Sequence, residues 1–420
     1  MKYPKSVSQN DQRRNSRLFL IVFLAALSAF GPFVTDFYLP ALPMQQTDFS
    51  TSAAMVQLGL SATMWGLAAG QLWVGPFSDR HGRRLPLAGS LAVFSLATLG
   101  AVFSPTIEVF IGMRFLEGLG ASGALVMSRS VAADLYTGRE LGSFMAVVGA
   151  VQGIAPVTAP MFGALIADFA GWREIFWLLF AIGAVLLVLT VLRFCESLPP
   201  ERRRRAGEGS AASFVFLMKD TLFVAVVLQQ LASSFVLFGH ISASPFIFQT
   251  HFGLSATAYG LLFGGMATGV TVGAISSSRM PSPAAALEAG AWGMLCGAVL
   301  TAGAFWADLP LWATVPAFLV LLLSLGLTLP AAMTFALTLH RERAGAAAAV
   351  LGAVAFVSGG AAAPLTSVAD PRLCVSIIFI VSAVILVAIA LWMRPMVHIL
   401  VKRKPAGEPV RLSGTGSDED

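Results

Sequence analysis

Long apolar runs separated by short polar segments fill the chain from about residue 18 to residue 396. A helix that crosses a lipid bilayer needs roughly 20 mainly apolar residues. Because lipid offers no partner to backbone N–H and C=O groups, such runs are expected to be helical, and they lack the short alternating segments of a β-barrel. The pattern predicts twelve membrane-spanning helices, at about residues 18–40, 53–77, 85–104, 107–133, 141–168, 174–195, 221–248, 257–280, 283–306, 311–337, 344–368 and 372–396.

Composition supports a membrane protein and argues against a soluble one. Of the 420 residues, 56% are hydrophobic and 12% are charged, whereas soluble domains carry about 25% charged residues. The first apolar run is too long for the core of a signal peptide, so we expect it to be retained as the first helix. The cysteines Cys195, Cys296 and Cys374 show no CxxC spacing. They indicate neither a disulfide framework nor a metal site, and we expect no cofactor.

The placement of charge predicts how the chain crosses the membrane. The net charge is +5, but the charged residues cluster in short segments between apolar runs, so we expect no nucleic-acid partner. With the N-terminus in the cytoplasm, the cytoplasmic segments hold Lys2, Lys5, Arg13, Arg14, Arg17, Arg80, Arg83, Arg84, Arg139, Arg202 to Arg205, Lys219, Arg279, Arg341, Arg343 and Lys402 to Lys404. The opposite segments hold Asp48, Glu108, Asp168, Arg173, Glu174, Asp308, Asp370 and Arg372. This positive-inside asymmetry predicts an even helix count with both termini cytoplasmic.

A polar stretch in the middle of the chain separates six predicted helices from six others. Two pseudo-symmetric halves joined by a central loop suit a transporter with its substrate site between the halves. The predicted parts are a cytoplasmic N-terminal segment, a first six-helix bundle, a cytoplasmic central loop, a second six-helix bundle and a cytoplasmic tail, at residues 1–17, 18–195, 196–220, 221–396 and 397–420.

The segment between the second and third predicted helices carries the most specific motif. It reads Gly75-Pro76-Phe77-Ser78-Asp79-Arg80-His81-Gly82-Arg83-Arg84. We expect Gly75 to allow close helix approach, Asp79 to cap a helix start and pair with an arginine, and Gly82 to permit a tight turn. A plain basic turn is the alternative, but the segment resembles the G-x-x-x-D-R-x-G-R-R signature of the major facilitator superfamily. That resemblance implies an all-α fold of twelve helices in two six-helix bundles, with this segment, including Arg80, Arg83 and Arg84, acting in conformational gating.

The fourth predicted helix contains Arg114 and, three residues later, Glu117. Residues i and i+3 share a helix face, and a charged side chain within a span is expected to face a polar cavity or an opposite charge. The segment resembles the superfamily motif that often reads R-x-x-Q-G in exporters, with Glu117 in place of the glutamine. Glu117 is either an ion-pair partner of Arg114 or a participant in proton handling or cation binding.

The fifth predicted helix contains Pro156 and Pro160, four residues apart. Small residues at helical spacing allow close helix packing in membranes, and prolines bend helices. The segment resembles the antiporter motif of drug exporters, although Ala155 and Ala159 stand where that motif has glycine. A generic kinked helix is the alternative. The resemblance implies an exporter in which both prolines take part in gating.

The first predicted helix ends in a short string that contains Asp36 and Tyr38. A carboxyl group kept from water can exchange a proton at neutral pH. The D-x-Y-L-P-A-x-P string resembles the bicyclomycin and chloramphenicol resistance branch of the superfamily, known as Bcr/CflA, and the resemblance covers about residues 18–200. It implies a role for Asp36 in proton coupling, together with Arg114 and Glu117, and in substrate binding. The alternative is an interfacial acid at a helix end.

The seventh predicted helix has a polar and aromatic face that suits an amphiphilic ligand, although ordinary bundle packing explains many of its residues as well. His240 on this face could titrate near neutral pH. The residues that we expect to bind substrate are Asp36, Tyr38, Gln57, Met127, Gln230, Ser234, Phe235, Phe238, His240 and Phe246.

Taken together, the motifs predict a monomeric transporter of the bacterial inner membrane that exports moderately apolar drugs in exchange for protons by alternating access. Its partners are then the drug, protons and membrane lipid. We find no Walker loop, no zincin histidine pair and no Gly-x-Ser-x-Gly motif, so we do not expect an ATP-driven pump or an enzyme. A metabolite exporter on the same fold, a membrane sensor or scaffold, and an intramembrane enzyme are the rival functions.

Overall fold

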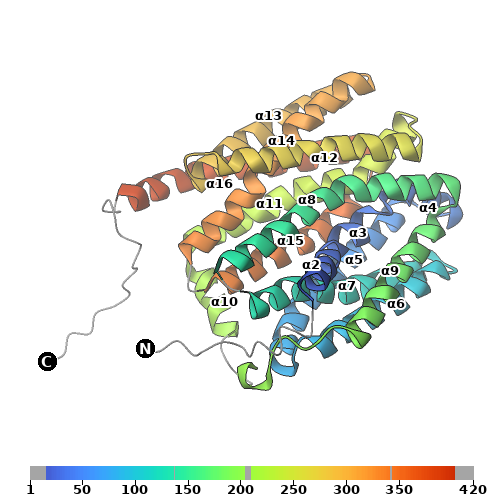
Figure 1. Ribbon diagram of the computed structural model, residues 1–420. Helices are drawn as coiled ribbons and strands as arrows, with labels where there is room; N and C mark the ends of the chain where they lie inside the picture. The colour runs from blue at the N-terminus through green and yellow to red at the C-terminus, as the bar shows by residue number, and fades with distance from the viewer. Residues whose placement is uncertain (1–15, 137, 204–209, 341–342, 403–420) are drawn as a thin grey trace.

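The computed structural model describes residues 16–136, 138–203, 210–340 and 343–402, and in these ranges the chain forms helices and no strands. The long helices lie side by side in one bundle, shown in Figure 1. Ten helical segments in the described part of the chain are long and apolar enough to cross a membrane. Two further long helices in the described residues, α5 and α8, bring the number to twelve. Each of the twelve predicted segments therefore corresponds to a helix.

The first half of the chain contains the first six of these segments. Their helices are α2 (Arg17–Ser28), α3 (Phe30–Asp36), η1 (Leu39–Ala41), α4 (Leu42–Asp48), α5 (Ala53–His81), α6 (Arg84–Val102), α7 (Ile107–Leu135), α8 (Gly138–Phe169) and α9 (Trp172–Leu192). Helix α5 is 29 residues long but rich in small and polar residues. The apolar part of α8 in the described residues is the shorter Gly153–Phe169.

The second half begins after a linker that holds η2 (Pro200–Arg202) and α10 (Ser210–Lys219). The remaining six segments are α11 (Thr221–Pro245) with its π-helical extension η3 (Phe246–His251), α12 (Ala256–Ser278), α13 (Pro283–Trp306), α14 (Leu311–Leu339), α15 (Ala344–Leu365) and α16 (Pro371–Lys402). Helix α10 lies inside the stretch that we predicted as a loop. Helix α16 extends beyond its predicted end, and the tail after Lys402 lies outside the described residues.

The first segment differs from the single helix that we predicted over residues 18–40. It is broken after Ser28 and again after Asp36, and it continues as helix to Asp48. Pro40 explains the second break, because proline has no N–H with which to bond the carbonyl of Asp36 one turn earlier. The break leaves Asp36 at the end of α3, where a side chain can approach from outside the helix.

The two halves meet along two pairs of helices, α5 with α15 and α8 with α12. We call the end of the bundle where α2 begins the termini end, and the end with α4 the far end. The start of α2 lies beside the end of α9, since the guanidinium of Arg193 stacks over the Phe19 ring at 5.0 Å. Twelve consecutive crossings therefore return the described C-terminal helix to the termini end.

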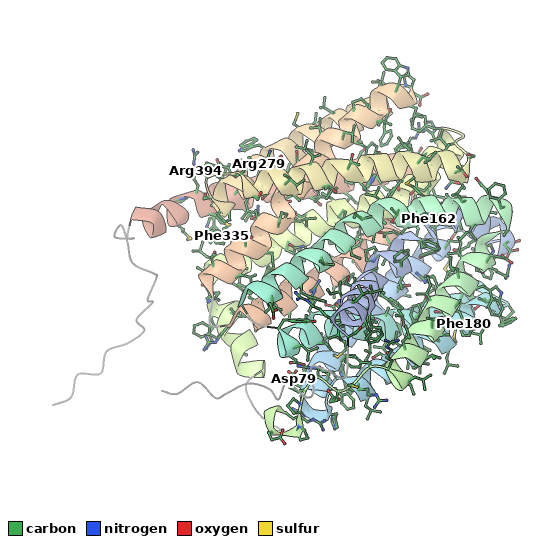
Figure 2. All side chains as sticks on the ribbon, viewed as in Figure 1. Asp79, Phe162, Phe180, Arg279, Phe335 and Arg394 are labelled. Atoms are coloured by element: carbon green, nitrogen blue, oxygen red, sulfur yellow. The ribbon has the colours of Figure 1, made fainter. Side chains whose placement is uncertain are left out.

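Side chains on the outside of the bundle suit a lipid environment. In Figure 2 the labelled Phe162 and Phe180 lie along the flanks, whereas Asp79, Arg279 and Arg394 lie toward the termini end. Phe162 is 57% exposed. Exposed apolar side chains over the whole flank would be a liability in water, but they match a hydrocarbon solvent.

Candidate functional site

Asp36 lies at the break in the first segment and faces the second half of the protein. Its side chain is 5% exposed, and the Thr35 hydroxyl donates a hydrogen bond of 2.8 Å to its Oδ1. The next turn, η1, contacts α11 and α12. The hydroxyl of Tyr259 on α12 lies within electrostatic range of Asp36 and shares a hydrogen bond of 2.8 Å with Ser244 on α11. Asp36 is thus enclosed between the halves.

Arg114 on α7 is fully buried and has three kinds of contact. Its Nη1 donates to Glu117 Oε2 at 2.5 Å, and its Nη2 donates to the Val34 carbonyl at 2.8 Å. Its guanidinium lies over the Tyr38 ring, 4.2 Å from the centroid, and 5.3 Å from the centroid of Phe176. Val34 is in the last turn of α3, where carbonyls have no partner within the helix, so Arg114 caps the break beside Asp36.

Glu117 is 0% exposed, as is Arg114, and the predicted i,i+3 pair is therefore formed in a dry environment. Arg114 Nε and Glu117 Oε1 have no hydrogen-bond partner among the described residues. Among the residues that the structure describes, no Lys, Arg or His lies within salt-bridge distance of Asp36. The structure therefore brings the three predicted coupling residues into one region, but it pairs Arg114 with Glu117 and not with Asp36.

Gln57 joins the two halves through its side-chain amide. Its Nε2 donates to the Ser242 carbonyl at 2.9 Å, and its Oε1 accepts from the Thr366 hydroxyl at 3.1 Å. We predicted Gln57 as a substrate-binding residue, and in this conformation both ends of its amide are engaged by α11 and α15. The sequence analysis did not identify Ser242 and Thr366 as partners of Gln57. The only indication in the sequence was that each is a hydroxyl residue among apolar ones.

Two further contacts close the far end between the halves. Gln249 Nε2 donates to the Pro40 carbonyl at 3.0 Å. Asp168 Oδ2, at the end of α8, accepts hydrogen bonds from the backbone N–H and the hydroxyl of Thr257 on α12. Together with Gln57 these contacts form what we call the far-end closure, made of Pro40, Gln57, Asp168, Ser242, Gln249, Thr257 and Thr366.

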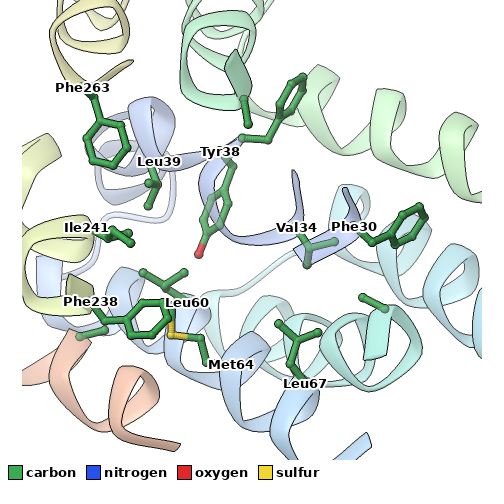
Figure 3. Packing of buried hydrophobic residues seen from close by; sticks show 14 of the residues in the cluster. Phe30, Val34, Tyr38, Leu39, Leu60, Met64, Leu67, Phe238, Ile241 and Phe263 are labelled. Atoms are coloured by element: carbon green, nitrogen blue, oxygen red, sulfur yellow. The ribbon is translucent and has the colours of Figure 1, made fainter. Parts of the chain in front are cut away.

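The predicted face of the seventh segment divides between two environments. Phe238 approaches the first half, where Leu60 and Met64 of α5 lie beside it in Figure 3. His240 instead stacks on Phe263 at 5.4 Å, 5.3 Å from Phe318, inside the second half. Among the described residues, the ring contacts of His240 are therefore with aromatic side chains of the second half.

The other predicted binding residues take varied positions. Gln230 donates to Ser234 within α11 at 3.2 Å. Phe246 is buried in η3, Met127 is buried on α7, and Phe235 is half-buried. The structure thus brings Tyr38 near Asp36, whereas four of these five side chains are buried on α7, α11 or η3 and Phe235 is partly exposed.

The segment after α5 that we predicted to act in gating is organised around Arg83, which is buried. Arg83 donates to Asp79 at 2.6 Å, to Asp134 on α7 at 2.8 Å, and to the Ser78 hydroxyl at 2.7 Å. Burial alone would lower the pKa of Arg83, but the hydrogen bonds and charges of Asp134 and Asp79 outweigh burial and raise it. Asp134 was not predicted. Arg80 is exposed.

Glu196, which was not predicted, caps the start of α6. Its carboxylate accepts the backbone N–H groups of Arg83 at 2.7 Å and Arg84 at 3.2 Å, at the start of α6. Asp79 lies in the last turn of α5 and pairs with Arg83. Glu196 lies 113 residues from Arg83 along the chain, so no local pattern could have identified it.

The two predicted glycines of this segment differ in their outcome. Gly82 has φ of 92°, a left-handed conformation that glycine adopts without strain, and a side chain there would overlap the Glu196 carboxylate. The tight turn is confirmed. Among the described residues, a methyl group at Gly75 would meet only Val126, at 3.9 Å, so close helix approach at Gly75 stays a prediction. Arg84 donates to the Thr190 and Val191 carbonyls at the end of α9.

Pro156 and Pro160 lie inside α8, which packs on α12. Pro160 is buried and Pro156 is half-buried. A side chain at Gly260 on α12 would come within 2.9 Å of the Pro160 carbonyl, and one at Gly163 would overlap the Phe37 carbonyl at the break of the first segment. Helix α8 thus touches both the second half and the backbone beside Asp36.

Comparisons with known proteins agree with this architecture. Residues 18–364 match the family model of the Major Facilitator Superfamily. The uncharacterized MFS-type transporter YdgK of Bacillus subtilis strain 168 is 34% identical over 363 residues, covering 84% of this chain and 89% of the relative. The chloramphenicol resistance protein of Pseudomonas aeruginosa is 31% identical over 304 residues, covering 70% of each chain. A bicyclomycin resistance protein homolog of Haemophilus influenzae is 26% identical, covering 60% of this chain and 64% of the relative.

Solved structures share the fold at low sequence identity. An inward-facing, unoccupied bacterial homolog of the human lysosomal transporter Spinster has a TM-score of 0.74 and 17% identity, covering 93% of this chain and 99% of that chain. A D-xylose-proton symporter has a TM-score of 0.68 and 18% identity, covering 88% and 97%. The sequence matches and the helical fold agree: the chain is a multi-pass membrane transporter that belongs to the Major Facilitator Superfamily, and its relatives include proteins named for drug resistance.

Proposed function

We propose that this transporter exports small, moderately apolar drugs or antibiotics across the bacterial inner membrane in exchange for protons. The observation that carries the proposal is the position of Asp36, a carboxyl group sealed between the halves at a break in the first segment. Asp36 accepts one hydrogen bond, from Thr35, but a carboxylate that is kept from water and has no cationic partner still gains from binding a proton or a ligand. Occupancy of one carboxyl by either proton or cargo couples the two fluxes.

Alternating access supplies the path. In the proposal, both termini are cytoplasmic, because the segments rich in Lys and Arg lie on the same side as the termini and such segments face the cytoplasm. The far-end closure then seals the outer side of the protein, and its hydrogen bonds must break before cargo leaves. The two halves, residues 18–195 and 221–396, move as bodies about the site with residues 196–220 as their connection.

The chemistry at the interface favours an apolar cargo over a sugar or an amino acid. Apolar and aromatic side chains pack where the first segment and α5 meet α11, and Figure 3 shows Leu39, Leu60, Met64, Phe238 and Ile241 there. A sugar would need many hydrogen-bonding groups in their place, because buried polar groups must find partners. The resistance proteins among the relatives support the same class of substrate.

The driving force is sufficient with a single proton. A charge that crosses the membrane gains about 2.3 kcal/mol per 100 mV, and one unit of pH difference adds about 1.4 kcal/mol. For a neutral drug, one proton can therefore sustain a concentration ratio of several hundredfold, on the order of 500.

Drug efflux from cells expressing the protein tests the proposal. We expect Asp36→Asn to abolish efflux of chloramphenicol that a protonophore can inhibit, because the amide cannot exchange a proton. Arg114→Ala is expected to reduce efflux by opening the cap on α3. Glu108→Gln, an exposed carboxyl in the first turn of α7, is the matched control and should retain efflux. Unchanged, protonophore-sensitive efflux by Asp36→Asn at normal expression would exclude Asp36 as the coupling group.

A further inference from the structure

The charge of Arg114 is neutralised by Glu117, a residue of the same helix. Glu117 Oε2 lies 2.5 Å from Arg114 Nη1, and both side chains are 0% exposed. The second nitrogen of the guanidinium, Nη2, is held by a neutral group, the Val34 carbonyl. A neutral side chain in place of Glu117 would leave one uncompensated positive charge beside the end of α3. With Glu117 present, the pair contributes no net charge to the region.

Among the described side chains, Asp36 itself has no ion-pair partner, so no opposite charge balances it when it is ionised. The hydroxyl of Tyr38 lies within electrostatic range of Arg114, Glu117 and Asp36. The ion pair and Asp36 therefore lie around the same tyrosine. From the second half, α12 presents the neutral hydroxyl of Tyr259, and α11 turns His240 away toward Phe263 and Phe318.

The remaining elements around α3 add no compensating charge. Helix α5 presents the amide of Gln57. The carboxylate of α8 nearest this level, Asp168, is held by Thr257 at the far end. Arg129 lies 15 residues after Arg114 on α7, about 22 Å along the helix axis. When Asp36 loses its proton, the enclosed region therefore carries one negative charge.

We propose that Glu117 sets the charge preference of this transporter, so that the cargo exchanged at Asp36 is a lipophilic organic cation with a single positive charge. The inference rests on the proposed function and specifies its substrate class. A proton and a monovalent cation each neutralise the carboxylate, whereas a neutral drug leaves it uncompensated in a low-dielectric setting. One proton enters for each cation that leaves, so no net charge crosses the membrane in one cycle.

Purified transporter in liposomes gives the first test, with ethidium as the monovalent cation and chloramphenicol as the neutral probe. We expect ethidium to be accumulated in response to an imposed pH difference, and its steady-state ratio to be unaffected by a membrane potential set with potassium and valinomycin. If one proton were exchanged for a neutral drug, an imposed potential of 100 mV would change the steady-state concentration ratio of that drug about 50-fold. A potential-dependent ethidium ratio of that size overturns the inference.

Two variants give the second test. Glu117→Gln leaves Arg114 uncompensated, so the region becomes neutral when Asp36 is deprotonated, and we expect the affinity for ethidium relative to chloramphenicol to fall at least tenfold, on the order expected for an unscreened charge nearby. The double variant Arg114→Gln/Glu117→Gln restores a single negative charge and should regain the preference for ethidium. Binding of both probes to purified protein, followed by fluorescence and by competition, does not require transport.

The outcomes separate this inference from the function on which it rests. If Glu117→Gln does not fold, the double variant and the wild-type potential test still decide. If Glu117→Gln retains the wild-type preference, or if the wild type exchanges chloramphenicol but not ethidium, the charge preference is wrong and proton-coupled drug export stands. If neither probe is moved by a pH difference and Asp36→Asn changes nothing, the proposed function itself fails.

Discussion

The buried ion pair of Arg114 and Glu117 makes a quantitative prediction about stability. Replacing Glu117 by leucine removes the only anion within 4 Å of Arg114 among the described residues. Arginine cannot shed its charge, so the variant must bury an uncompensated cation. Breaking a buried pair in this way costs about 3–5 kcal/mol. Since 1.4 kcal/mol is a factor of ten, we expect the unfolding equilibrium constant to rise by about two to four orders of magnitude.

The double variant Arg114→Met/Glu117→Leu should recover much of that loss. Replacing both partners of a buried pair by apolar residues is often neutral or stabilising. Here the recovery is incomplete, because the Val34 carbonyl loses its donor, and an unsatisfied buried group costs about 1–3 kcal/mol. The free energy of unfolding of the single variant Arg114→Met should lie between those of Glu117→Leu and the double variant, because an unpaired glutamate can be neutralised by a proton.

Unfolding of purified protein by titration with sodium dodecyl sulfate in mixed micelles measures these free energies. The control is Arg173→Met, which breaks the exposed pair between Arg173 and Asp48 (2.7 Å, 38% and 43% exposed) and should cost less than about 1 kcal/mol. If Glu117→Leu is as stable as the wild type, or if the double variant loses the sum of both single losses, Arg114 and Glu117 are not a closed pair, and the charge argument for the cargo is lost with it.

Three further predictions concern other parts of the molecule. Gly82→Ala should destabilise the first half by about 1–3 kcal/mol, because φ of 92° strains alanine; a wild-type unfolding curve would contradict this. Glu196→Gln should weaken the hydrogen bonds to the amides of Arg83 and Arg84 by about 1–2 kcal/mol, seen as faster hydrogen exchange there and not at α13. Gln57→Leu removes two hydrogen bonds between the halves and should shift the population toward a state open at the far end by about 1–3 kcal/mol; unchanged distances between spin labels at that end would refute it.

Hydropathy predicted the helices well because the requirement for apolar length acts on each segment separately. It missed the breaks in the first segment, since Pro40 and Pro43 lie among apolar residues that continue as helix to Asp48. The spacing of Arg114 and Glu117 predicted their contact, because both lie on one helix face.

Contacts between distant segments could not be predicted in the same way. Gln57 and Thr366 are 309 residues apart, and either could have paired with many other polar groups. The failure to identify Glu196 as the cap of α6 has the same origin. Local spacing restricts partners on one helix, whereas the choice of partner across helices depends on packing that no single segment encodes.

The break beside Asp36 requires both members of the buried pair. Ending α3 at Asp36 leaves the Val34 carbonyl in a region without water, and a cation at a helix C-terminus satisfies such a carbonyl and the helix dipole together. Arg114 does so, but alone it would place an uncompensated positive charge near Asp36, the carboxyl that we propose exchanges protons, and it would favour the ionised carboxylate. Glu117 removes the excess charge without displacing the guanidinium from Val34. Arg114 therefore fixes the geometry of the site, and Glu117 leaves Asp36 available to its ligands.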